Sequence, residues 1–185
     1  MILIMGGNSG LGRKIISGFK KEQIIISVKT WRKVDESISF YPIRFADFDD
    51  KKSLEMAFSG IKILFFISGN TSSEKRIQQH NNVIEIAKEK GVEHVFYTSF
   101  IDVDPASPFL FSSSHEKTEF FIQESGLYYT ILRNNLYSDF ITRFTQNAMD
   151  CIGVPAGHGK IAFISREDIA IFAVKVLRIL PRGYN

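Results

Sequence analysis

A glycine-rich segment lies directly between the first apolar run of the chain, residues 2–5, and the first stretch with helical spacing, residues 11–20. A turn of this kind between a buried strand and a helix is typical of the first βα unit of a dinucleotide-binding sheet. Glycine lets the backbone approach a phosphate closely, and the unpaired N–H groups at a helix N-terminus attract negative charge. We therefore expect a pyrophosphate to be cradled by Gly6, Asn8, Ser9, Gly10, Leu11 and Gly12. The alternative is an ordinary glycine turn, which the position between strand and helix disfavours.

The rest of the chain alternates short apolar runs with stretches of helical spacing, which predicts repeated βαβ units. The expected strands span residues 2–5, 24–28, 41–45, 61–68, 92–99, 128–133 and 161–164. The expected helices span residues 11–20, 51–58, 74–90 and 166–180, and a further helix begins near Ser113. We therefore expect an α/β fold with a Rossmann-like, doubly wound parallel sheet and helices on both faces, in one domain over residues 1–185.

Three pairs of residues have the spacing of a helix capping box, in which a hydroxyl and an acidic side chain stand three residues apart. They are Thr71 with Glu74, Ser113 with Glu116, and Ser165 with Asp168. Each pair precedes or opens an expected helix, so the pairs predict three helix starts.

Composition excludes several classes of protein. Lys and Arg number 23 against 20 Asp and Glu, and the basic residues are scattered, so we expect no nucleic-acid partner. No apolar run approaches the roughly 18 residues that span a bilayer, so we expect no membrane partner and a soluble, cytoplasmic protein. The single cysteine, Cys151, excludes an internal disulfide, and no Cys or His pair has ligand spacing, so we expect no metal site.

The end of the second expected strand indicates which dinucleotide binds. An NAD site places Asp or Glu there to bind the ribose hydroxyls, whereas this chain has Lys29, followed by Arg32 and Lys33. Cationic side chains at this place suit a 2′-phosphate, so we expect NADP(H), held by Lys29 and Arg32. The alternative is that the three residues form an ordinary solvated loop.

At this level of detail the chain resembles the NmrA-like branch of the atypical short-chain dehydrogenase/reductases, most closely the NAD(P)H:quinone oxidoreductase 2 type. The resemblance runs nearly end to end and rests on ordered segments rather than on one motif. Besides the glycine loop these are Ala46-Asp47-Phe48, residues 79–84, Gly91-Val92, Tyr97-Thr98-Ser99, His115, Thr118-Glu119, residues 125–127 and 129–134, Tyr137-Ser138, Gly157, residues 159–161, Arg166 and Asp168.

The resemblance implies an NADP(H)-dependent oxidoreductase that passes hydride from the nicotinamide to a quinone or similar conjugated acceptor. It places Asp47 and Phe48 beside the adenine, and it places Ile67, Ser68 and Gly69 along the cofactor. It places Thr98 and Ser99 near the nicotinamide. For these residues several alternatives stay open: core packing at Phe48, a turn or cap at Asp47, a strand end at Ser68, and satisfied strand-end hydroxyls at Thr98 and Ser99.

The chain departs from the broader dehydrogenase pattern because the Tyr-x-x-x-Lys pair is missing. Phe111 stands where the tyrosine is expected, and phenylalanine donates no proton. Quinone reduction tolerates this loss, because the acceptor itself stabilises negative charge and solvent supplies the proton. We expect His115 to contact the cofactor or donate a proton, with a helix-start neighbour as the alternative, and Tyr137 to line the substrate pocket.

The second departure is length. The resemblance implies a smaller C-terminal lobe that closes over the substrate, and most of that lobe is absent from residues 1–185. Bare apolar surface would then favour self-association as a homodimer. Two alternatives to a quinone reductase therefore stay open: a non-catalytic NADP(H)-binding redox sensor and an inactive truncated remnant.

Overall fold

The computed structural model describes residues 1–104, 106–141 and 159–179, so Cys151 and Gly157 lie outside the described residues. The strands are β1 (Ile2–Met5), β2 (Ile24–Val28), β3 (Ile43–Phe45), β4 (Ile63–Phe66), β5 (His94–Phe100) and β6 (Tyr128–Asn134). The α-helices are α1 (Gly10–Ile16), α2 (Lys51–Ala57), α3 (Ser73–Glu89), α4 (Ser112–Glu124) and α6 (Arg166–Ile179). Three short 3₁₀ helices are η1 (Trp31–Lys33), η2 (Glu36–Ile38) and η3 (Ser138–Phe140).

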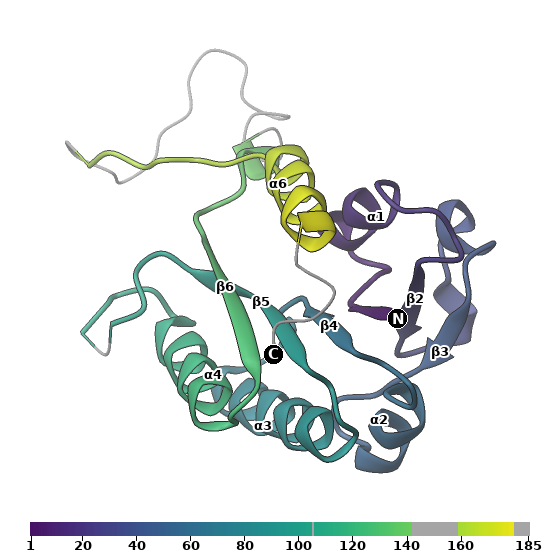
Figure 1. The fold of residues 1–185 in the computed structure, drawn as a ribbon. Helices are drawn as coiled ribbons and strands as arrows, with labels where there is room; N and C mark the ends of the chain where they lie inside the picture. Colours follow the sequence, from purple (N-terminus) through teal and green to yellow (C-terminus); the bar gives the residue numbers. More distant parts are fainter. Residues whose placement is uncertain (105, 142–158, 180–185) are drawn as a thin grey trace.

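The six strands form one parallel sheet in the order β3-β2-β1-β4-β5-β6. Helices α2, α3 and α4 cover one face, and α1 and α6 cover the other (Figure 1). This arrangement confirms the predicted Rossmann-like, doubly wound fold. The chain builds outward from β1 to β3 and then returns to place β4 beside β1, so a crevice opens at the carboxyl ends of β1 and β4, where such sheets bind ligands.

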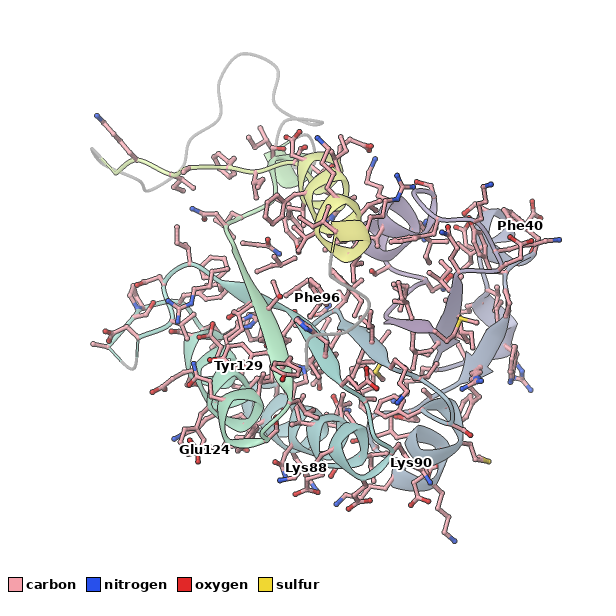
Figure 2. All side chains as sticks on the ribbon, viewed as in Figure 1. Phe40, Lys88, Lys90, Phe96, Glu124 and Tyr129 are labelled. Carbon is pink, nitrogen blue, oxygen red and sulfur yellow. The ribbon has the colours of Figure 1, made fainter. Side chains whose placement is uncertain are left out.

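Alternate residues of each central strand enter different cores, as the parallel sheet requires. In β4, Leu64 and Phe66 pack with α2 and α3, whereas Phe65 packs with α1 and α6. Figure 2 shows Phe96 inside the molecule, whereas Lys88 and Glu124 project from helices into solvent. Each fully buried side chain of this size contributes roughly 1.5–3 kcal/mol relative to exposure, so the sheet holds the crevice rigidly.

The turn from β1 into α1 depends on two glycines. Gly6 has φ +79, a left-handed conformation that other residues rarely adopt. A Cβ on Gly12 would lie 2.4 Å from the carbonyl oxygen of Gly6, so only glycine allows the helix to start this close to the strand. The side chain of Ser9 accepts a hydrogen bond from the Gly12 N–H at 3.0 Å and caps α1.

One expected strand is wrong. Residues 161–164 do not join the sheet; only Ile164 forms a bridge, with Tyr137. The Ile164 N–H donates to the carbonyl oxygen of Leu136 at 3.1 Å, so this segment pairs with the chain beyond β6 rather than with the sheet. Because it stands outside the layers, Ile161 and Phe163 are exposed.

Two of the three expected capping boxes are wrong. The N-cap position of α3 is Ser72 rather than Thr71, with no capping hydrogen bond from its side chain, and Ser113 lies inside α4, whose N-cap is Phe111. The third is confirmed: Ser165 Oγ donates to Asp168 Oδ2 at 2.7 Å and accepts from the Asp168 N–H at 3.0 Å. The spacing alone does not decide which hydroxyl has the extended backbone that a cap requires.

None of the helices in the described part of the chain has the length and hydropathy of a membrane span.

The confirmed and the failed capping box make a matched pair for a stability measurement. We expect Ser165→Ala to lower the free energy of unfolding by about 1 kcal/mol, because α6 loses its cap. Ser113→Ala removes the same hydroxyl from an exposed position inside α4, where it makes an exposed 3.3 Å contact with Ser73 Oγ, so we expect a change within about 0.5 kcal/mol. Urea unfolding of both variants checks this, and equal losses would contradict the assignment.

Candidate cofactor-binding site

A cavity of about 430 Å³ opens where the carboxyl ends of β1, β2 and β4 meet. The segments that line it are the glycine loop, the end of β2 with the loop after it, the residues after β3, and the start of α3 with the loop before it. The lining residues are Gly6, Asn8, Ser9, Ser27, Val28, Lys29, Thr30, Lys33, Ala46, Asp47, Phe48, Gly69, Asn70, Thr71, Lys75 and Gln79.

Some residues of the glycine loop line the cavity, and others are buried next to it. Gly6, Asn8 and Ser9 line the cavity, whereas Leu11 and Gly12 are buried beneath it in the first turn of α1. Gly10 is exposed, and a Cβ added to it would lie 3.6 Å from Arg166 of α6. The N-cap of α1, Ser9, therefore lies at the cavity, where the positive end of the helix attracts an anion.

Three lysines give the cavity its charge: Lys29, Lys33 and Lys75. Lys29 Nζ lies 3.1 Å from Asp47 Oδ1, and this contact raises the pKa of Lys29, so the ammonium stays charged. Lys33 lines the cavity, whereas the expected Arg32 does not, because successive residues of η1 point in different directions.

Asp49, in the loop after β3, binds two polar side chains of α3 that line the cavity. Gln79 Nε2 donates to Asp49 Oδ2 at 2.9 Å, and Lys75 Nζ lies 3.1 Å from the same oxygen. The hydrogen bond from Gln79 is the largest cause of the lowered pKa of Asp49, so this carboxylate stays ionised. With Asp47 it faces Lys29 as well, at 3.7 Å. The wall between β3 and α3 is therefore a charged network rather than an apolar surface.

Phe48 packs against the hydrophobic core and also lines the cavity. Its ring meets Phe66 edge-on, with centroids 5.5 Å apart, and its carbonyl oxygen accepts from Asn82 Nδ2 at 3.0 Å. Asp47 Oδ1 also accepts from the Asp49 N–H at 3.0 Å, which is a turn contact. Both residues thus combine the structural role and exposure to the cavity.

The segment after β4 is held from two sides. The Ser68 N–H donates to Thr98 Oγ1 at 2.9 Å, and the Gly69 N–H donates to His80 Nε2 at 3.2 Å. Gly69 lines the cavity, whereas Ile67 and Thr98 are buried and Ser68 is half-buried outside its lining. Thr98 is thus a satisfied strand-end hydroxyl that positions the segment along which a cofactor would lie.

His80, which the sequence analysis did not single out, is fully buried in α3. Burial is the first cause that lowers its pKa well below the usual value, so the imidazole is neutral. Because Nε2 accepts from Gly69, Nδ1 carries the proton and donates to Thr118 Oγ1 at 2.8 Å, and that hydroxyl donates to the Ser114 carbonyl oxygen at 2.7 Å. The chain of bonds ties the cavity to α4.

Ser99 and His115 belong to the same buried layer. Ser99 Oγ donates to Glu119, whose carboxylate also accepts two bonds from Arg133, at 3.1 and 2.6 Å. His115 Nδ1 lies 2.8 Å from the hydroxyl of the fully buried Tyr97. Burial, and after it the charge of Arg76, lower the pKa of His115 to about 4, so it is neutral near pH 7.

The remaining expected residue, Tyr137, lies after β6, with the guanidinium carbon of Arg166 4.7 Å from its ring centroid. Burial raises its pKa, so the phenol stays protonated. Phe111, where the tyrosine of the dehydrogenases is expected, packs its ring 4.0 Å from the guanidinium carbon of Arg76. Tyr137 and His115 do not line the cavity described above.

Several lining residues were not predicted. Lys75 and Gln79 stand four residues apart on α3, so they lie on the same face of the helix, and both line the cavity. Their spacing could have identified this face from the sequence. Arg76, between them, turns inward instead: it is 4 % exposed, and its Nε has no hydrogen-bond partner. Nothing in the local sequence separates the direction of the Arg76 side chain from that of Lys75.

Among residues 1–104, 106–141 and 159–179 no group of three or more His, Cys, Asp or Glu residues could hold a metal ion.

The sequence profile of a family described as NAD(P)H-binding matches residues 6–179, from the glycine loop to the end of α6. The chain belongs to this NAD(P)H-binding family. The match covers every segment that lines the cavity, so it confirms the expected class of cofactor.

Two kinds of relative confirm the expected resemblance. Quinone oxidoreductase 2 of Escherichia coli is 35 % identical over an alignment of 185 positions, which covers 96 % of this chain and 64 % of that protein. The triphenylmethane reductase of Citrobacter sp., solved with NADP(H), has a TM-score of 0.89 at 30 % identity and covers 98 % of this chain and 66 % of its own. An NADPH-dependent quinone oxidoreductase from E. coli, solved with NADPH, has a TM-score of 0.87 at 34 % identity over 100 % of this chain and 66 % of its own. The chain thus spans slightly less than two thirds of these proteins.

The neutral state of His115 can be measured. A folded-state pKa near 4 lies below the usual 6.5, so the unfolded chain binds protons more strongly between these values and stability falls as the pH falls. We expect His115 alone to lower the free energy of unfolding by about 2 kcal/mol from pH 7 to pH 5. His115→Gln should remove that share of the pH dependence. An NMR titration midpoint of the His115 ring near 6.5 would contradict the assignment.

Proposed function

We propose that this chain binds NADPH in the cavity between the glycine loop and the end of β2. The observation that carries the proposal is the lining itself: a backbone turn open to a pyrophosphate on one side and Lys29, Lys33 and Lys75 on the other. The residues fit the adenosine half of the cofactor, because β2 ends at Val28 and is followed directly by Lys29 rather than by Asp or Glu.

The proposed contacts follow from the place of each residue. Gly6, Ser9 and Gly10, with Leu11 and Gly12 forming the helix start, receive the pyrophosphate. Lys29 and Lys33 receive the 2′-phosphate, with Arg32 at the edge. Asp47 and Phe48 flank the adenine, and the segment of Ile67, Ser68 and Gly69 follows the cofactor toward Thr98 and Ser99.

For the chemistry, we propose hydride transfer to a quinone or similar conjugated acceptor. Bound NADPH supplies the hydride; a proton from solvent completes the hydroquinone. Two of the relatives named above support this, since one is a quinone oxidoreductase and the other a triphenylmethane reductase. His115 is neutral and hydrogen-bonded, so its proposed role is contact with the cofactor rather than acid catalysis. Tyr137 is proposed to contact the acceptor.

We also propose that the protein is located in the cytoplasm and that it self-associates through exposed apolar residues such as Phe172.

A second candidate function is a non-catalytic NADP(H)-binding redox sensor. The observation that favours it is the loss of the expected proton-donating tyrosine: Phe111 stands in its place, and the nearby His115 is neutral. Such a protein binds the cofactor without turnover.

Oxidation of NADPH by the purified chain, with a simple benzoquinone in excess, separates the two functions. We expect turnover, and we expect Gly10→Asp to abolish it, because a carboxylate at the start of α1 repels the pyrophosphate. Turnover that survives in the variant would contradict the proposed phosphate site. Binding without turnover would favour the sensor, and a folded chain that binds no NADPH would contradict both.

Lys29 tests the choice between the two dinucleotides. We expect Lys29→Ala to weaken NADPH binding by about tenfold, the value of one charge-assisted hydrogen bond, and to change NADH binding by less than about twofold. Lys62→Ala, which removes an equally exposed lysine of another ion pair, is the control. Calorimetric titration of both cofactors measures the effect, and equal losses for both would refute the assignment of Lys29.

A further inference from the structure

Asn8 lines the cavity, and its carboxamide binds backbone groups of the loop after β2. Its Nδ2 donates to the carbonyl oxygen of Lys33 at 2.6 Å, and its Oδ1 accepts from the N–H of Asp35 at 2.9 Å. One carboxamide therefore binds two backbone groups that stand two residues apart. The glycine loop after β1 is joined in this way to the loop after β2, across 25 and 27 residues of sequence.

Arg13 closes the connection from α1. Its Nη1 donates to the carbonyl oxygen of Asn8 at 2.7 Å and lies 3.4 Å from Asp35 Oδ2. Asp35 Oδ1 in turn accepts from the hydroxyl of Ser37 at 2.6 Å, the first cause of the lowered pKa of Asp35, so the carboxylate is ionised. We call Asn8, Arg13, Lys33 and Asp35 the loop brace.

The loop brace connects the two walls that would meet the two phosphate groups of NADPH. Asn8 stands in the wall with Gly6 and Ser9, and Lys33 stands in the wall with Lys29. Arg13 and Asp35 do not line the cavity, so they act on it only through the other two residues.

We propose that Asn8 is a positioning residue that sets the preference for NADPH over NADH. This rests on the proposed binding of NADPH. The pyrophosphate and the 2′-phosphate leave the same ribose, at its 5′ and 2′ positions, so their separation is nearly fixed. A protein that holds the two anion sites at that separation loses less freedom on binding. NADH needs only the first site, so it gains little from the brace.

Arg13 makes the proposal separable from a direct contact of Asn8 with the cofactor. Arg13→Met removes the bond to the Asn8 carbonyl and the pair with Asp35 at a partly exposed position outside the cavity, so the fold tolerates it. Lys14→Met is the matched control: it removes the same charge from the next residue of α1, whose partner is Glu167 of α6.

The test is calorimetric titration of the full chain with NADPH and with NADH, for the wild type, Asn8→Ala, Arg13→Met and Lys14→Met. We expect the ratio of the dissociation constant of NADH to that of NADPH to fall at least fivefold in Asn8→Ala and about threefold in Arg13→Met. The change should come from weaker NADPH binding, with NADH within twofold, and Lys14→Met should keep the wild-type ratio. An unchanged ratio in Arg13→Met, or equal losses for both cofactors in Asn8→Ala, would overturn the proposal. A wild type that binds NADPH no better than NADH would overturn the proposed function with it.

Discussion

The contact between the backbones of Gly12 and Gly6 is the constraint on which the rest of the structure depends. A Cβ on Gly12 would stand 2.4 Å from the Gly6 oxygen, so α1 starts immediately against the end of β1 only because both positions are glycine. This turn directs the start of α1 at the carboxyl edge of the sheet and lets α1 pack beside α6. This close approach therefore places the N-terminus of α1 beside the cavity and sets α1 against its face of the sheet.

A buried polar layer between the sheet and helices α3 and α4 holds the other side of the site. His80 fixes the Gly69 N–H, and Thr98 fixes the Ser68 N–H, while Tyr97 and His115 continue the layer beneath α4. The imidazoles of His80 and His115 are neutral here, because burial and the positive charge of the nearby Arg76 both lower their pKa values. The layer sets the path past β4, whereas the loop brace sets the spacing near β2.

The periodicity of the sequence predicted the fold, because buried parallel strands read as continuous apolar runs and the glycine loop marked the first crossover. Residues 161–164 failed as a strand since apolar, β-branched composition does not say whether a partner strand lies alongside. The glycine loop and Lys29 could be expected at the cavity from their place after strands. The inward turn of Arg76, the buried His80 and the choice of Lys33 over Arg32 depend on packing between distant segments, which local pattern does not contain.

We propose that one cavity recognises both a 5′-phosphate and a 2′-phosphate on the same ribose. The most direct measurement is calorimetric titration of the wild-type chain with adenosine 2′,5′-bisphosphate and with 5′-AMP, which need neither a nicotinamide nor turnover. We expect the bisphosphate to bind at least about tenfold more tightly, the value of one added charge-assisted contact. Equal affinities, or no binding of either ligand by the folded chain, would contradict the account.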